Sequence, residues 1–226
     1  MKVPAVIVLS VSAIAALGCA TPADEARVTK EGLLAIRSSD LDEFYVRPTG
    51  DLSAYGKAWV EPVAVSLRDD YVSQRHAYNR FQPIYPRYQE AETLMALTAQ
   101  SVHQGLEDAF KARGYDVVDT PEPGALRISA SVSDLFVNAP DRLSPWITRN
   151  ATRDAGQAVL SLEARDPVQG TVLARIVHHL IVREVSRANL ANDVTNGMWL
   201  DNAFRRWAAH SAAALASRRT VSASGT

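Results

Sequence analysis

Residues 126–133 read Leu-Arg-Ile-Ser-Ala-Ser-Val-Ser, and their alternation indicates the fold class. Every second residue is apolar, and the residues between them are arginine or serine. Because successive side chains of a strand point to opposite faces, this stretch predicts a strand with one buried and one solvated face. Such strands belong to sheets that are covered on one side only.

The segments on either side of this stretch predict four more strands. Residues 158–165 and 171–183 are rich in apolar residues, and Asp166-Pro167-Val168-Gln169-Gly170 between them suits the tight turn of a hairpin. Residues 57–67 and 115–119 predict two strands nearer the N-terminus. Pro62 lacks an N–H group, so it places the first of these at an edge or a bulge.

Two segments have the spacing of amphipathic helices, at about 90–113 and 194–217. The first ends at Gly114, and the second begins near the capping residues Asn192 and Asp193. The apolar side predicted for the first consists of Leu94, Leu97, Val102, Leu106, Ala109 and Phe110. The side predicted for the second consists of Leu200, Phe204, Trp207, Ser211 and Leu215.

This order of elements predicts an α+β protein, a two-layer α/β sandwich. We expect a mixed, mostly antiparallel sheet of about five strands, with both helices on one face. The first strand, the first helix and the next strand would form a crossover, and the later strands would be antiparallel. The expected organisation is a signal peptide at 1–18, a lipidated N-terminus and tether at 19–31, one domain at 32–219 and a disordered tail at 220–226.

The N-terminus has the pattern of an export signal. Lys2 is followed by an uncharged apolar run at 3–17. This run is shorter than the roughly 20 residues that a membrane-spanning helix needs. The run ends in Ala16-Leu17-Gly18-Cys19, which resembles the lipobox of bacterial lipoproteins. That resemblance implies a diacylglyceryl group on the Cys19 thiol, cleavage between Gly18 and Cys19, and acylation of the new amino group, including a palmitate-type chain. The alternative is an ordinary secretory signal with a coincidental cysteine.

The residue after Cys19 bears on location. Inner-membrane lipoproteins of that family usually carry Asp there, whereas this chain has Ala20. The resemblance therefore implies an outer-membrane lipoprotein with its domain in the periplasm. Because Cys19 is the only cysteine and would carry lipid, the mature chain would have no thiol for a disulfide or for catalysis.

Several stretches together resemble a bacterial family of lipoproteins of unknown function, the domain-of-unknown-function group 3313. The resemblance covers roughly residues 32–215 and implies an envelope location and a fold, without any chemistry. The residues that carry it are Tyr45-Val46-Arg47-Pro48, Tyr55, Val60-Glu61-Pro62-Val63, Gly114 to Asp119, Leu126 to Leu135, Leu162 to Asp166 and Gly170.

Composition and motifs argue against several functions. A net charge of -1 gives no general attraction to nucleic acid. His178 and His179 are neighbours on a predicted strand, so they would point to opposite faces and could not share a metal ion. The sequence has no nucleophile elbow and no glycine-rich phosphate loop, so we expect neither an enzyme nor a cofactor.

One aromatic and basic segment is the candidate binding surface. Guanidinium groups beside aromatic rings suit stacking on sugars, lipid headgroups or a protein partner. The alternative is a long loop whose aromatic residues fold back onto the core. A second insert, 138–156, contains Trp146 and three arginines and has a similar character. The candidate residues are Tyr71, Arg75, Tyr78, Arg80, Phe81, Tyr85, Arg87 and Tyr88.

The leading functional hypothesis is a non-enzymatic envelope lipoprotein, an accessory or assembly factor that binds a protein partner or the cell wall. The membrane would be met only through the lipid on Cys19. A second hypothesis is an envelope hydrolase that uses a carboxylate pair drawn from Asp69, Asp70, Glu107, Asp108 and Asp134. A third is a structural envelope stress protein.

Overall fold

The alternating stretch lies at the centre of an eight-stranded sheet. The structure, a computed structural model, describes residues 28–71, 87–137, 154–183 and 193–223. Leu126, Ile128, Ala130 and Val132 are at most 5% exposed. The arginine and serines between them are half-buried, so the predicted alternation is confirmed.

The strands are long in the middle of the sheet and short at its edges. The sheet order is β1-β2-β8-β7-β6-β3-β5, and β4 also pairs with β6. The pairs that join β3 to β5, β3 to β6 and β4 to β6 are parallel, and the others are antiparallel. The strands are β1 (Leu34–Ala35), β2 (Glu43–Val46), β3 (Lys57–Val60), β4 (Ala64–Leu67), β5 (Asp116–Val117), β6 (Ala125–Val137), β7 (Asp154–Arg165) and β8 (Val172–Arg183).

The mixed α+β architecture is confirmed, but the number of strands was underestimated. The predicted strand 57–67 is two strands, β3 and β4, because Glu61-Pro62-Val63 separates them. Proline cannot donate to a ladder, which accounts for the interruption. The other two additions, β1 and β2, are short strands that extend the sheet beyond β8, and their sequences lack the alternation of β6.

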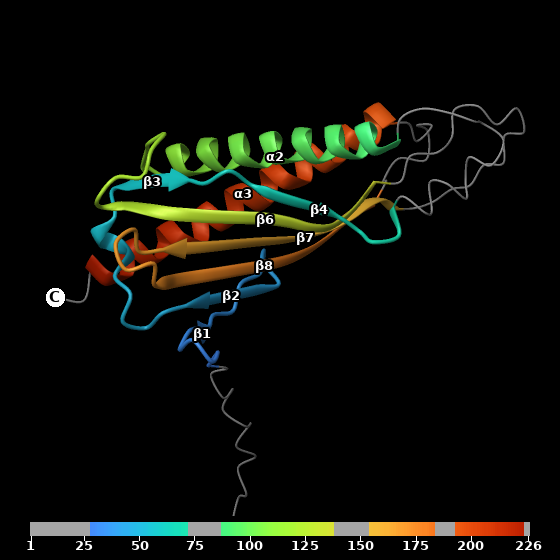
Figure 1. The fold of residues 1–226 in the computed structure, drawn as a ribbon. Coiled ribbons are helices and arrows are strands. Elements are labelled where there is room, and N and C mark those ends of the chain that lie inside the picture. The colour runs from blue at the N-terminus through green and yellow to red at the C-terminus, as the bar shows by residue number, and fades with distance from the viewer. Residues whose placement is uncertain (1–27, 72–86, 138–153, 184–192, 224–226) are drawn as a thin grey trace, which may run out of the picture.

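Two long helices cover one face of the sheet (Figure 1). They are α2 (Arg87–Ala112) and α3 (Asp193–Ala223). A short 3-10 helix, η1 (Leu52–Ala54), packs against α3. The two long helices run in the same direction, since Ser101 bonds to Asp201 and Gly105 faces Arg205 and Ala208 one turn later. The predicted layers and the parallel β3–α2–β5 crossover are therefore confirmed.

The predicted face of α3 is buried throughout, and that of α2 only in part. All five residues predicted for α3 are at most 5% exposed. On α2, Leu97 is 60% exposed, and Thr98 is buried in its place. At about 100° per residue, Leu97 lies roughly 140° around the helix from the fully buried Val102. The prediction for Leu97 was therefore wrong.

Both ends of the folded body extend further than expected. Val28 forms a bridge with Leu34, and Thr29 donates its N–H to Leu33 O at 2.9 Å, so residues 28–31 of the predicted tether belong to the fold. At the other end α3 continues through Ala223, so residues 220–223 of the predicted tail are helical. The signal peptide and Cys19 lie outside the described residues.

Candidate binding surface at one end of the sheet

One end of the sheet gathers chain ends that are far apart in the sequence (Figure 1). Val137 pairs with Gly156, and Asp154 pairs with Arg183. Segments 72–86, 138–153 and 184–192, which are not described, therefore all leave from this end and return to it. We call it the segment end, defined by Tyr71, Arg87, Val137, Asp154, Arg183 and Asp193.

The candidate binding residues fall mostly on one of these segments. Tyr71 is described and is only 4% exposed. Arg87 and Tyr88 lie in the first turn of α2, and their side chains are not described. Arg75, Tyr78, Arg80, Phe81 and Tyr85 lie outside the described residues, as do positions 138–153 of the second insert. Its last positions, 154–156, are the start of β7 rather than a loop.

An arginine and two aromatic rings form a small cluster at the segment end. The Arg68 guanidinium lies 3.9 Å from the centre of the Phe136 ring. The Tyr71 ring meets Phe136 edge to face at 6.1 Å. Arg68 Nε also donates to Asp70 Oδ1 at 2.5 Å. Sequence reasoning identified Tyr71 and missed Arg68, just after β4, and Phe136, on β6, because neither has a local signal.

A bulge in β6 positions this cluster. The register with β7 shifts between Ser133 and Phe136, and Asp134 has a φ of 57°. Asp tolerates this left-handed conformation better than most residues. An extra residue in one strand bends it and re-aims the side chains that follow. The bulge thereby lets Phe136 meet Arg68 and Tyr71.

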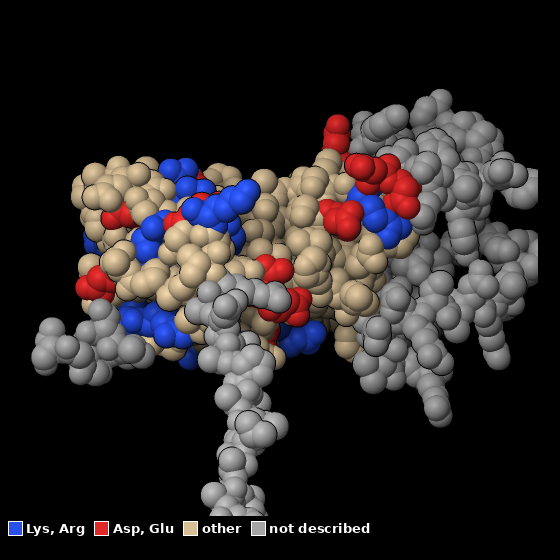
Figure 2. Space-filling model, turned by 90° about the horizontal axis from the view of Figure 1, so that it is seen from below, with Lys and Arg blue, Asp and Glu red and all other residues tan. Residues whose placement is uncertain are grey.

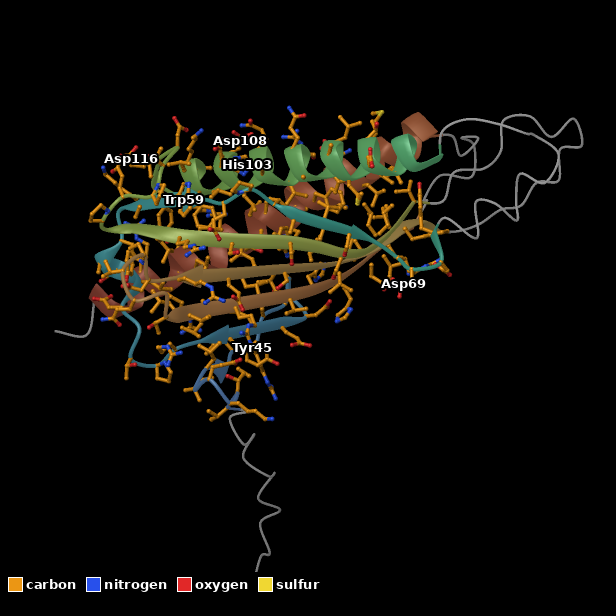
Figure 3. All side chains as sticks on the ribbon, in the orientation of Figure 1. Tyr45, Trp59, Asp69, His103, Asp108 and Asp116 are labelled. Atoms are coloured by element: carbon orange, nitrogen blue, oxygen red, sulfur yellow. The ribbon has the colours of Figure 1, made fainter. Side chains whose placement is uncertain are left out.

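The carboxylates considered for a hydrolase do not form a single group. Asp69 lies at the segment end, whereas Asp108 lies far along α2 (Figure 3). Asp108 accepts a hydrogen bond from Gln104 at 3.0 Å and lies 3.9 Å from Arg205. Its neighbour Glu107 lies 3.6 Å from Lys111. Glu107 therefore pairs within α2 and Asp108 faces α3, and the structure does not bring either carboxylate to Asp69.

The histidines that make described polar contacts lie in two places, on α2 and on β8. His103 Nδ1 is 3.2 Å from Glu61 O, and its Nε2 is 3.4 Å from Glu107. The other two, His178 and His179, lie on β8. Asp42 lies 3.2 Å from His178 Nδ1 and accepts the backbone N–H of His179 at 2.6 Å. Within the described ranges, no three His, Cys, Asp or Glu side chains come together as a metal site.

A tyrosine and an aspartate meet at the β7–β8 turn, away from the segment end. Tyr55 donates to Asp166 Oδ2 at 2.5 Å, and Asp166 Oδ1 accepts the N–H groups of Val168 at 2.8 Å and Gln169 at 2.6 Å. Burial and then this hydrogen bond raise the pKa of Tyr55 to about 12. The Gln169 N–H and then the Tyr55 hydroxyl lower the pKa of Asp166. The pair holds the β7–β8 turn against the residues that follow η1.

These features define an α+β sandwich domain whose chain segments gather at one end. Of the helices in the described ranges, none combines the length and hydropathy needed to cross a bilayer. A family model described as "Protein of unknown function (DUF3313)" matches residues 31–210. The chain belongs to this family, as its sequence resemblance implied.

Comparison with curated proteins finds no match. Among solved structures, the PelC dodecamer from Paraburkholderia phytofirmans is 13% identical, with a TM-score of 0.35 over 70% of this chain and 91% of that chain. A neuraminyllactose-binding hemagglutinin homologue from Helicobacter pylori is 12% identical, with a TM-score of 0.38 over 77% of this chain and 92% of that chain. These likenesses are too distant to bear on function.

Proposed function

We propose that this protein is a lipid-anchored lipoprotein of the bacterial cell envelope that acts as a non-enzymatic accessory or assembly factor. Cys19 carries the lipid, and the domain stands on the periplasmic side of the outer membrane. The segment end binds a protein partner or the cell wall.

The gathering of the chain segments at one end of the sheet is the observation that carries this proposal. The segment with Arg75, Tyr78, Arg80 and Phe81 leaves from the same end as the insert with Trp146. The described Arg68–Phe136 contact at that end already pairs a guanidinium with an aromatic ring. Arginine and aromatic residues are enriched where proteins bind their partners.

Crosslinking in intact cells tests the binding surface. We expect a photoreactive residue at position 78 to capture a specific partner, which mass spectrometry then identifies. The double variant Arg75→Ala with Arg80→Ala should lose the adduct, because it removes two guanidinium groups from the surface. The matched control, Arg113→Ala with Arg206→Ala, changes two exposed arginines, one just after α2 and one on α3, and should retain the adduct. Equal effects of the two double variants would refute this site.

Fractionation of Cys19→Ser cells tests the anchor. We expect the variant to move from the membrane to the soluble fraction, because acyl chains contribute roughly 0.8 kcal/mol per buried methylene to membrane binding. The unchanged protein should also incorporate labelled palmitate, and the variant should not. A variant that stays firmly in the membrane would contradict the proposal.

A further inference from the structure

Residues 28–48 are firmly fixed to the β8 edge of the sheet. β2 pairs with β8 over four residues, from Glu43 opposite Val177 to Val46 opposite Ala174. The Arg47 side chain donates to Val172 O at 2.7 Å and to Glu31 O at 3.0 Å. These hydrogen bonds join β8 to the turn that precedes β1.

Ion pairing and burial hold the same segment. The Glu31 carboxylate lies 3.1 Å from Arg175 on β8, and this contact lowers the pKa of Glu31. Leu33, Leu41 and Phe44 are at most 5% exposed. Burying a side chain of this size stabilises a fold by about 1.5–3 kcal/mol. The chain is therefore held to the sheet from Val28 onward.

The chain between the proposed lipid anchor and this body is short. Cys19 and Val28 are nine positions apart. At no more than ~3.6 Å per residue, such a chain spans at most about 32 Å in any conformation. Val28 cannot lie further than this from the lipidated residue.

The sheet is almost as wide as this maximum reach. Six strand spacings separate β1 from β5 in the sheet order. At ~4.8 Å each, these spacings amount to about 29 Å. If the β5 edge faced the bilayer, Val28 would stand about 29 Å above it, and the connecting chain would need almost complete extension. Nearly all conformations of that chain would be lost, which costs entropy.

We propose that the β1–β2 edge is the side of the protein that meets the lipid bilayer, an inference that rests on lipidation of Cys19. The sheet then stands with β1 and β2 nearest the membrane and β5 furthest from it. The segment end then points parallel to the membrane surface, because it lies at the C-terminal ends of β6 and β8 and the strands run along the bilayer (Figure 1).

Charge does not hold this edge at the membrane. Its exposed ionic residues are two basic and four acidic, a sum of -2, so an anionic bilayer would not attract it. Figure 2 views the protein from this side and shows blue and red side chains interspersed. The tether therefore sets the orientation, which should not respond to salt. The residues counted are Lys30, Arg37, Glu31, Asp40, Asp42 and Glu43.

Fluorescence quenching in vesicles tests this orientation. Lys30 lies beside β1 and Asp119 just after β5, and both are exposed. Lipidated Lys30→Cys and Asp119→Cys variants would each carry one fluorophore, in phosphatidylethanolamine vesicles with nitroxide-labelled headgroups. Cys19 is the only native cysteine, and lipid occupies its sulfur, so each label is unique. We expect quenching several-fold stronger at position 30 than at position 119, in both low and high salt.

A lengthened tether provides the control. Inserting about 20 glycine and serine residues between Ala23 and Asp24 raises the maximum reach to about 100 Å and should make the two positions nearly equal. Equal or reversed quenching with the native tether would overturn the proposed orientation. Failure of the protein to bind vesicles at all would instead contradict the lipid anchor.

Discussion

Asp166 joins two parts of the chain with a single carboxylate. It accepts backbone N–H groups from its own turn and the hydroxyl of Tyr55, which lies 111 positions earlier. Charge-assisted hydrogen bonds of this kind are stronger than neutral ones. The turn sequence predicted the hairpin, but nothing in it indicated Tyr55.

We expect Asp166→Asn to lower the free energy of unfolding by about 1–2 kcal/mol at neutral pH. Folding lowers the pKa of Asp166, so the ionised carboxylate contributes to the stability of the folded protein. This stabilisation is fully present above the unfolded pKa of about 3.9 and is lost as pH falls through the folded pKa. Urea unfolding from pH 7 to pH 3 should therefore show the two proteins converging. The exposed control Asp119→Asn should match the parent at every pH, and a constant difference for Asp166→Asn would contradict the linkage.

Ser211 is a buried hydroxyl without a hydrogen-bond partner among the described residues. It is 0% exposed on α3. A desolvated hydroxyl that makes no bond costs free energy, so Ser211→Ala should leave stability unchanged or raise it by about 1 kcal/mol. Ser101→Ala is the matched control, because the Ser101 hydroxyl donates to Asp201 and its loss should destabilise. Thermal denaturation of both variants checks the prediction, and a lower melting temperature for Ser211→Ala would contradict it.

At the scale of elements, the bulge in β6 and Gly156 on β7 together let the neighbouring elements approach closely. A Cβ at Gly156 would lie 2.7 Å from Phe136 O and 3.2 Å from Leu200 Cδ1. The bulged strand and α3 therefore both approach β7 where it has no side chain.

We expect Gly156→Ala to destabilise the protein by about 1–3 kcal/mol, because β6 and α3 would have to move apart. Gly56→Ala is the control, since a Cβ there would meet nothing within 4 Å and its φ is not left-handed. The urea midpoint of Gly156→Ala should be lower than that of Gly56→Ala. Hydrogen exchange should locate the weakened amides in β6 beyond Ser133, and weakening confined to β2 would contradict this account.

At the scale of the whole molecule, the N-terminal strands belong to the core although they lie next to the tether. Deleting residues 28–48 would expose the β8 edge and the apolar side chains now covered by Phe44 and Leu41. Exposed edge strands pair with other chains. In a Cys19→Ser background, we therefore expect this deletion to elute as oligomers or aggregates in size-exclusion chromatography. Deleting only residues 20–27 should leave the elution volume of the parent, and identical behaviour of both deletions would refute the structural role of 28–48.

Local sequence patterns predicted most of the architecture. Alternation in β6 and helical spacing in α3 each predicted which residues are buried, because burial on one face of a regular element imposes a period on the sequence. Stretches without such a period were harder to interpret. The short strands β1 and β2 were not among the five predicted strands, and Leu97 was placed on the wrong side of α2.

The candidate site divides in the same way. Composition identified the aromatic and basic segment at 71–88, because clusters of residue types are visible in a linear chain. The sequence could not show that the described residues flanking this segment lie at the same end of the sheet as Val137 and Asp154, nor that Arg68, just after β4, contacts Phe136 on β6.

The sequence by itself determined the layers of this protein, the buried faces of β6 and α3, and its family. Only the tertiary structure decided that Tyr71, Val137, Asp154 and Arg183 lie at one end of the sheet, that Tyr55 donates a hydrogen bond to Asp166, and that residues 28–48 cover the β8 edge. The physical reason is that periodicity records whether a residue is buried, whereas which distant residue buries it depends on how strands pair across the sheet.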